Sequence, residues 1–154
     1  MASRVVAVAA VAVTAALAVG PSLARPKAQT SRYFDIPAAE ATARVHRFMA
    51  AHRIRVDGSG GPGMIRARGP SAQGEWVNCR ARKGDIRAIS FDLTVMIDEA
   101  RRGGSTVTIL LNGDAVNARR NHFLFLPTTI EKTPITCSSS GRMEKNLFAY
   151  LAQD

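Results

Sequence analysis

Residues 89–97 carry the feature that most constrains the fold of this chain, an alternation of large apolar and mostly polar side chains. The apolar members are Ile89, Phe91, Leu93, Val95 and Ile97. Successive side chains of a β-strand point to opposite faces of a sheet, so these five share one face. The alternation therefore predicts a sheet with one face covered by other elements and the other face in contact with water.

Two segments have the apolar spacing of a helix that buries one stripe. The first is predicted over residues 38–52, directly after Pro37, with its stripe at Ala41, Val45, Phe48 and Met49. The second closes the chain, with its stripe at Met143, Leu147, Phe148 and Leu151. It is preceded by three N-cap candidates, Ser138, Ser139 and Ser140.

Short extended segments make up the rest of the predicted order. They are expected at residues 33–36, 53–56, 64–68, 75–82, 89–97, 106–111, 115–121 and 135–137, with a brief apolar run at 122–127. The glycine-rich stretch 57–63 predicts a flexible turn, and Asn112-Gly113 predicts a two-residue hairpin turn. A β-α-β order, followed by antiparallel strands and a terminal helix, predicts an α+β fold with two helices packed on one face of a mostly antiparallel sheet.

Residues 1–24 are predicted to be a cleaved export signal. Arg4 precedes an Ala- and Val-rich apolar run, and small residues up to Ala24 suit signal peptidase. The run is short for a bilayer-spanning helix, which needs about 20 residues, and an uncleaved N-terminal anchor is the alternative. Residues 25–32 are polar and predict a flexible leader, and residues 33–154 predict a single domain. Cleavage near Ala24 would place the protein in the periplasm or outside the cell.

Basic residues outnumber acidic ones, and the formal net charge of the whole chain is +9. Such a balance favours acidic partners, such as nucleic acid, anionic lipid or anionic envelope polymers. Most of the basic residues are arginines in an Ala-rich chain. A GC-rich genome produces that combination without selection for binding, so the charge has a purely compositional alternative.

Cys79 and Cys137 are the two cysteines of the chain. An exported protein meets an oxidising compartment, so we expect them to form a disulfide. The alternative is a nucleophilic Cys137, since it precedes a predicted helix N-terminus that would lower the pKa of a thiol. Its base would then be His46, His52 or His122.

An aromatic residue beside a row of arginines predicts a surface for anionic ligands. The strand predicted at 75–82 would place Trp76, Arg80 and Arg82 on one face, with Arg66 and Arg68 on a neighbouring strand. Guanidinium groups hold phosphates, and an indole stacks on bases or sugars. The alternative is that Trp76 packs under a helix while the arginines are only solvated.

Other chemistry is not indicated by the sequence. The three histidines do not have the spacing of metal ligands, and the stretch at 58–63 lacks the Gly-Lys-Ser/Thr ending of a phosphate-binding loop. We therefore expect no metal, no cofactor and no catalytic set.

Residues 34–56 resemble the short N-terminal domain of secretins and TonB-dependent receptors. The resemblance begins at the segment Phe34-Asp35-Ile36-Pro37-Ala38 and continues through a helix to Arg53-Ile54-Arg55-Val56. In this segment Ala41, Val45 and Phe48 fall where that family has leucines. The resemblance implies a Gram-negative envelope setting and a docking-type module.

Together these observations predict an exported, disulfide-stabilised, non-enzymatic protein that binds an envelope or secreted protein partner. Two alternatives remain at this point. One is a binder of anionic polymer or lipid through the arginine-rich strand face, and the other is a small secreted hydrolase that works through His122 or Cys137.

Overall fold

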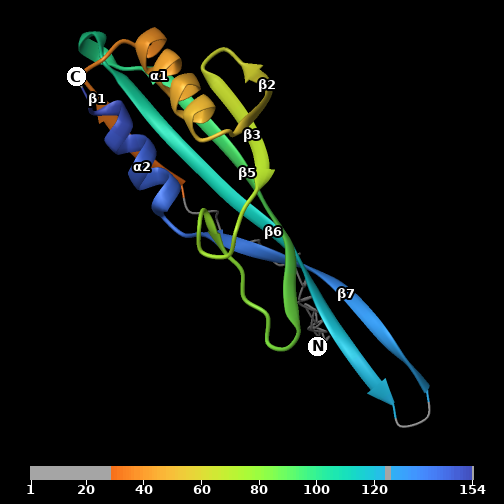
Figure 1. The fold of residues 1–154 in the computed structure, drawn as a ribbon. Helices are drawn as coiled ribbons and strands as arrows, with labels where there is room; N and C mark the ends of the chain where they lie inside the picture. Colours follow the sequence, from red (N-terminus) through yellow and green to blue (C-terminus); the bar gives the residue numbers. More distant parts are fainter. Residues whose placement is uncertain (1–28, 124–125, 154) are drawn as a thin grey trace, which may run out of the picture.

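A computed structural model describes residues 29–123 and 126–153, and it describes only the backbone of Gln29, Ser59 and residues 122–123 and 126–127. Figure 1 shows the elements, which are β1 (Gln29–Phe34), α1 (Ala38–Ala51), β2 (Arg55–Gly61), β3 (Met64–Pro70), β4 (Val77–Asn78), β5 (Asp85–Glu99), the 3-10 helix η1 (Arg101–Gly103), β6 (Ser105–Phe123), β7 (Leu126–Ser139) and α2 (Arg142–Leu151). The predicted export signal lies outside the described residues and stays a prediction.

Seven strands form one sheet, and all pairings between these strands are antiparallel. The strand order is β2-β3-β5-β6-β7-β4, and β1 pairs with β6 as well. β5 lies along one side of β6, while β1 pairs with residues 105–110 of β6 and β7 pairs with residues 112–123. β1 and β7 therefore follow each other along the other side of β6.

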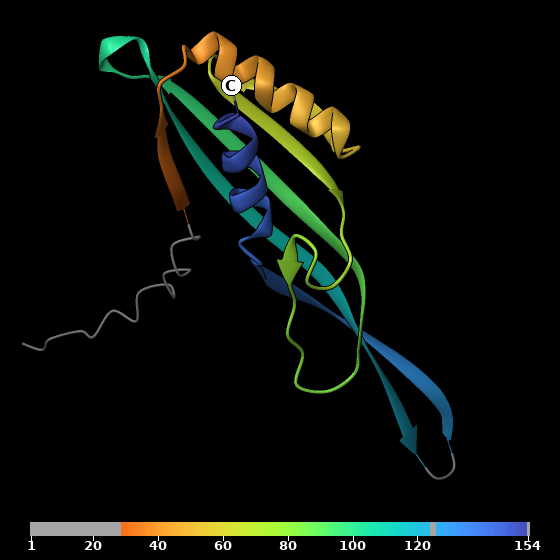
Figure 2. The same cartoon turned by 60° about the vertical axis from the view of Figure 1, so that its left-hand side comes forward.

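Both helices cover the same face of the sheet (Figure 2). The stripes of α1 and α2 are buried at the positions expected from their spacing. They pack with the apolar side of β5, where Phe91, Leu93, Val95 and Ile97 are buried. Polar residues of β5 such as Asp92 and Thr94 lie on the opposite, helix-free face. The predicted α+β fold with one covered sheet face is confirmed.

The predicted hairpin turn at Asn112-Gly113 is wrong. β6 continues through both residues, and Asn112 pairs with Asp92 on one side and Ser138 on the other. There is no room for a side chain at Gly113, because an added Cβ would lie 2.8 Å from Cγ1 of Val77 and 3.0 Å from Cβ of Cys137. β6 instead pairs with β7 in an antiparallel ladder that runs from Asn112 opposite Ser138 to Phe123 opposite Leu126.

Other boundaries also differ from the prediction. Residues 29–32 of the predicted flexible leader belong to β1, because their backbone pairs with β6 and the Ser31 and Thr108 hydroxyl groups are 2.8 Å apart. Residues 57–61 of the predicted turn belong to β2, where Gly58 and Gly61 adopt positive φ angles near shifts of register. The N-cap of α2 is Gly141 rather than a serine; Ser139 and Ser140 instead accept hydrogen bonds from the backbone N–H groups of Gly141 and Arg142.

The ends of β6 and β7 project beyond the rest of the sheet (Figure 1). β5 pairs with β6 only as far as Ala118, and β4 pairs with β7 only at Ser138 and Ser139. Beyond the last residue of β6 that pairs with β5, residues 119–123 pair, in the described structure, only with residues 126–131 and form a ladder of two strands. We call this projecting ladder the arm.

Candidate functional site

Among the surface hollows that contain arginines, two lie on opposite faces of the sheet. The first, the basic groove, lies between the loop 79–84 and the start of the arm and has a cavity volume of about 390 Å³. It is lined by Arg82, Lys83, Asn117, Arg119, Glu131 and Thr133. The second, the open-face groove, has a cavity volume of about 540 Å³ and includes Arg66, Arg68, Asp57 and Asp92.

The alternation along β6 assigns the basic groove to the side of the sheet that carries the helices. Leu111, Gly113 and Ala115 face that side, and Asn117 and Arg119 continue the same register. In β7, Thr133 pairs with Asn117 and Glu131 pairs with Arg119. Two positions from each strand therefore form the floor of the groove, and the loop 79–84 forms its wall.

The basic charges of this groove are not neutralised. Among the described residues, Arg82, Lys83 and Arg119 take part in no ion pair. The acidic group in the lining is Glu131, which accepts a hydrogen bond from Asn121 at 3.3 Å. Three cations against one carboxylate leave a local excess of positive charge on a concave surface. Such a surface attracts anions.

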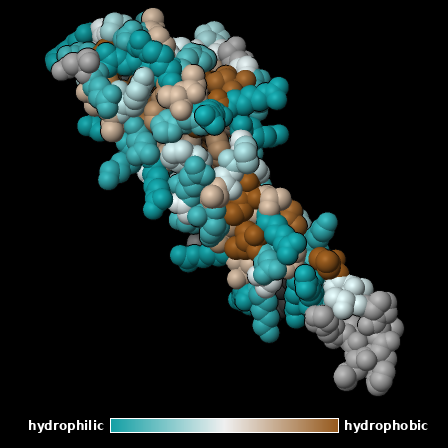
Figure 3. All heavy atoms as spheres, viewed as in Figure 1, coloured by the Kyte–Doolittle hydropathy of each residue, from teal (hydrophilic) through white to brown (hydrophobic). Residues whose placement is uncertain are grey.

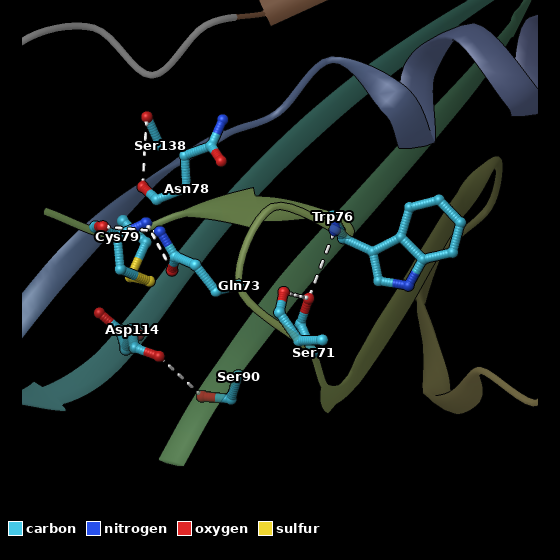
Figure 4. The surroundings of a disulfide bond; sticks show 10 residues. Ser71, Gln73, Trp76, Asn78, Cys79, Ser90, Asp114 and Ser138 are labelled. Atoms are coloured by element: carbon cyan, nitrogen blue, oxygen red, sulfur yellow. Dashed lines mark hydrogen bonds between the residues drawn. A yellow bond between two sulfur atoms is a disulfide. The ribbon is translucent and has the colours of Figure 1, made fainter. Parts of the chain in front are cut away.

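The loop 79–84 is held at both ends. At its start, a disulfide joins Cys79 to Cys137 of β7, with the two Cα atoms 4.3 Å apart. Gln73 holds the same residue through two hydrogen bonds, donating its amide to the Cys79 carbonyl (2.9 Å) and accepting from the Cys79 N–H (3.2 Å) (Figure 4). The predicted disulfide is thus present, and it orders the residue from which the basic loop begins.

Asn117 holds the far end of the loop. Its side-chain amide donates to the Lys83 carbonyl at 2.9 Å. Gly84, at a φ of +106°, lies so close to β6 that an added Cβ would be 2.5 Å from Oδ1 of Asn117. A side chain there would both strain the backbone and push the loop away. Glycine at 84 therefore allows the end of the loop to lie close against β6.

The open-face groove is closer to electrical neutrality. Nε of Arg68 lies 2.5 Å from Oδ1 of Asp92, which faces it from β5. The hydrogen bond and negative charge of Asp92 raise the pKa of Arg68. Asp57 also lines this groove, so its two arginines lie beside two carboxylates. An anion gains less here than in the basic groove.

The predicted arginine-rich strand face does not form. The strand expected at 75–82 is limited to Val77–Asn78, so Arg80 and Arg82 lie in the following loop. Arg66 and Arg68 lie on β3, on the helix-free face. The early end of β4 has a physical cause, because the side chain of Gln73 bonds both the backbone N–H and the carbonyl of Cys79, which are then not available to a neighbouring strand.

Trp76 is packed rather than displayed with the arginines. Its ring contacts His52 edge-on, with the ring centroids 5.8 Å apart, and it lies against the hydrophobic core. In Figure 4 the indole points away from the disulfide and from Cys79, where the loop 79–84 begins. This is the alternative in which Trp76 packs beside a helix.

The cysteine and histidine residues considered as catalytic or metal-binding candidates do not form a site in the described structure. Cys137 cannot be a thiol nucleophile, since its sulfur is in the disulfide. His46 is exposed on α1 and His52 follows the end of that helix, while the side chain of His122 lies outside what the structure describes. Within the described residues, no three His, Cys, Asp or Glu side chains gather closely enough to hold a metal ion.

Sequence reasoning missed five residues of the basic groove, namely Lys83, Asn117, Arg119, Glu131 and Thr133. The pairing of β6 with β7 brings the last four together. The turn predicted at Asn112-Gly113 excludes this pairing, because it ends the strand before Asn117 is reached. A hairpin centred near residues 124–125 would have matched Asn117 with Thr133 and Arg119 with Glu131.

Comparison with known protein families, curated proteins and solved structures finds no match to this chain. Function is therefore argued from the geometry of its own residues.

Proposed function

We propose that this is an exported, disulfide-stabilised, non-enzymatic protein that docks a protein partner through its arm. The observation that carries the proposal is the two-stranded ladder at 119–123 and 126–131, which extends past the strands on either side. A docking role also agrees with the envelope module that residues 34–56 resemble. That resemblance remains a proposal.

The arm offers main-chain groups to a partner. In the described part of the chain, no strand pairs with β7 on its outer side between residues 129 and 137, and none pairs with β6 on its outer side beyond Ala118. Unpaired strand edges bind an added strand through backbone hydrogen bonds. An isolated two-stranded hairpin is only marginally stable in water, so an added strand would stabilise it.

The arm also exposes apolar surface. Ile130 is 54% exposed, and it pairs across the ladder with the exposed Arg120. Figure 3 shows apolar side chains at the surface along the narrow part of the molecule that leads toward the arm. A large exposed aliphatic group beside a free strand edge is typical of a protein-binding surface.

Two observations support export. The apolar segment in residues 1–24 has the pattern of a cleaved signal, and the Cys79–Cys137 disulfide is the bond expected of a protein in an oxidising compartment. None of the described helices is both long enough and apolar enough to cross a membrane.

The test is affinity capture from envelope extract at high salt with the oxidised protein and two matched variants. Ile130→Thr removes the exposed aliphatic group of the arm but keeps a β-branched residue. Tyr33→Thr is the control, since Tyr33 is the other large exposed apolar residue among those that the structure describes, at 49% exposure, and lies on β1. We expect the I130T variant to bind the captured protein about fivefold more weakly or worse, with the control unchanged.

Equal capture by all three proteins would overturn docking through the arm. Capture that disappears at high salt for all three would do the same, because the contact would then be electrostatic.

A further inference from the structure

We propose that the basic groove is a binding site for the phosphate groups of an anionic polymer. This site is separate from the exposed aliphatic surface of the arm and goes beyond protein docking. The inference rests on three features of the described residues: unpaired cations that converge, a concave shape, and a loop fixed in position.

The donors in the groove suit phosphate. Arg82 and Arg119 bring two guanidinium groups to one hollow, and Lys83 adds an ammonium group. Guanidinium forks bind phosphate through two parallel hydrogen bonds, and such charge-assisted bonds are stronger than neutral ones. The Thr133 hydroxyl is a further donor in the lining. A phosphate group carries several strong acceptor oxygens that can meet these donors at once.

The shape favours a polymer chain over a flat membrane surface. The hollow lies between a loop and a two-stranded ladder, so its cations face a concave space. A strand of polymer can enter such a space, whereas a bilayer meets protruding side chains. A further cation, Arg80, lies in the same loop as Arg82 and Lys83 and is exposed, without an ion pair among the described residues. The exposed cations Arg120 and Lys132 occupy the alternate positions of the ladder and therefore lie on its other face.

Replacing Glu131 tests the site through a gain of binding rather than a loss. The Glu131 carboxylate is the negative group of the lining and would repel a bound phosphate. Glu131→Gln removes that repulsion but keeps the size of the side chain and an oxygen that can accept from Asn121. We therefore expect this variant to bind more tightly than the wild type. A role of Glu131 limited to packing in the arm predicts no gain.

The experiment measures binding of inorganic polyphosphate to the oxidised protein as a function of salt. Arg82→Gln and Arg119→Gln are each expected to weaken binding about threefold to tenfold, and to lower the slope of log affinity against log salt by about one. Arg66→Gln is the matched control, since Arg66 is exposed and unpaired in the described structure but lies on the opposite face. We expect its binding to equal that of the wild type.

Asn117→Ala tests whether position matters as well as charge. It removes the hydrogen bond to Lys83 and leaves every charge in place. We expect weaker polyphosphate binding from this variant with an unchanged salt slope. Thermal unfolding of each variant identifies any loss of fold, and the exposed Arg82→Gln change still tests the site if Asn117→Ala unfolds.

Three outcomes would overturn the proposal. One is equal weakening by Arg66→Gln and Arg82→Gln, which would mean diffuse attraction by net charge. Another is equal affinity for a carboxylate polymer of matched length, since phosphate would then not be recognised. The third is binding of anionic phospholipid vesicles but not of polyphosphate, which would assign the charge to a membrane surface.

Discussion

At the scale of single residues, Gly113 is a position where the neighbouring side chains leave no room for a Cβ atom. An added Cβ would lie 2.8 Å from Cγ1 and 2.9 Å from Cβ of Val77, which is fully buried. Valine is stiff at χ1, so it cannot move away without disturbing the core. The glycine thus allows β4 and the disulfide to pack directly on β6.

Gly113→Ala is expected to lower the free energy of unfolding by about 1–3 kcal/mol, the usual cost of overpacking. The measurement is urea unfolding of the oxidised protein. Val77→Ala serves as the partner in a double-mutant cycle, because it removes the methyl groups that the new Cβ would meet. We expect the double variant to be more stable than the sum of the two single effects predicts. Additive effects would show that the two side chains do not interact.

The same residue explains the main error in predicting this fold from sequence. Asn-Gly is a strong local signal for a two-residue turn, and propensity alone favours a turn at that point. The tertiary contact with Val77 and Cys137, more than 20 residues away in either direction, requires glycine for a different reason. A single sequence contains no sign of that contact, so the register of β6 with β7 and the basic groove could not be found.

At the scale of secondary structure elements, both helices could be predicted because their stripes are local. Every predicted stripe residue of α1 and α2 is buried. The strands were harder, since their lengths depend on partners distant in sequence. β5 and β6 extend well past the apolar cores that mark them, because each pairs with a neighbour along its whole length. β4 is short because the side chain of Gln73 bonds the backbone groups of Cys79 that would otherwise extend the ladder.

Arg44 links the two helices. Its guanidinium pairs with Glu40 within α1 (2.9 Å) and donates to the backbone carbonyls of Leu151 (3.1 Å) and Gln153 at the end of α2. Carbonyls at a helix C-terminus lack partners within the helix, so Arg44 satisfies groups that would otherwise depend on water. The hydrogen bond from Arg44 also lowers the pKa of the Glu40 carboxyl.

Arg44→Gln is expected to destabilise the protein by about 1 kcal/mol and to speed amide hydrogen exchange in the last turn of α2. Arg47→Gln is the control, because Arg47 also bonds Glu40 but, among the described residues, forms no hydrogen bond or ion pair with α2. Since the pKa of Glu40 is lowered on folding, its contribution is present above the ordinary carboxyl pKa and is lost as pH falls through the lowered value. Equal exchange rates in the two variants would contradict the link between helices.

At the scale of the whole molecule, the two helices close one face of the sheet, and the disulfide lies where that covered region gives way to the arm. Cys79 and Cys137 are 58 residues apart in sequence. Their bond joins β7 to the loop that forms the wall of the basic groove, so it affects both the stability of the fold and the geometry of that groove.

Replacing both cysteines by alanine tests this double role. The chain-entropy model assigns a loop of this length about 4 kcal/mol of stabilisation, a large share of the 5–15 kcal/mol of a typical domain. We expect urea unfolding to show a loss of that order, and polyphosphate binding to weaken at temperatures where the variant is still folded. Reductant should have the same effects on the wild type and none on the variant. A variant that loses stability but binds polyphosphate as tightly as the wild type would show that Gln73 and Asn117 hold the loop without the disulfide.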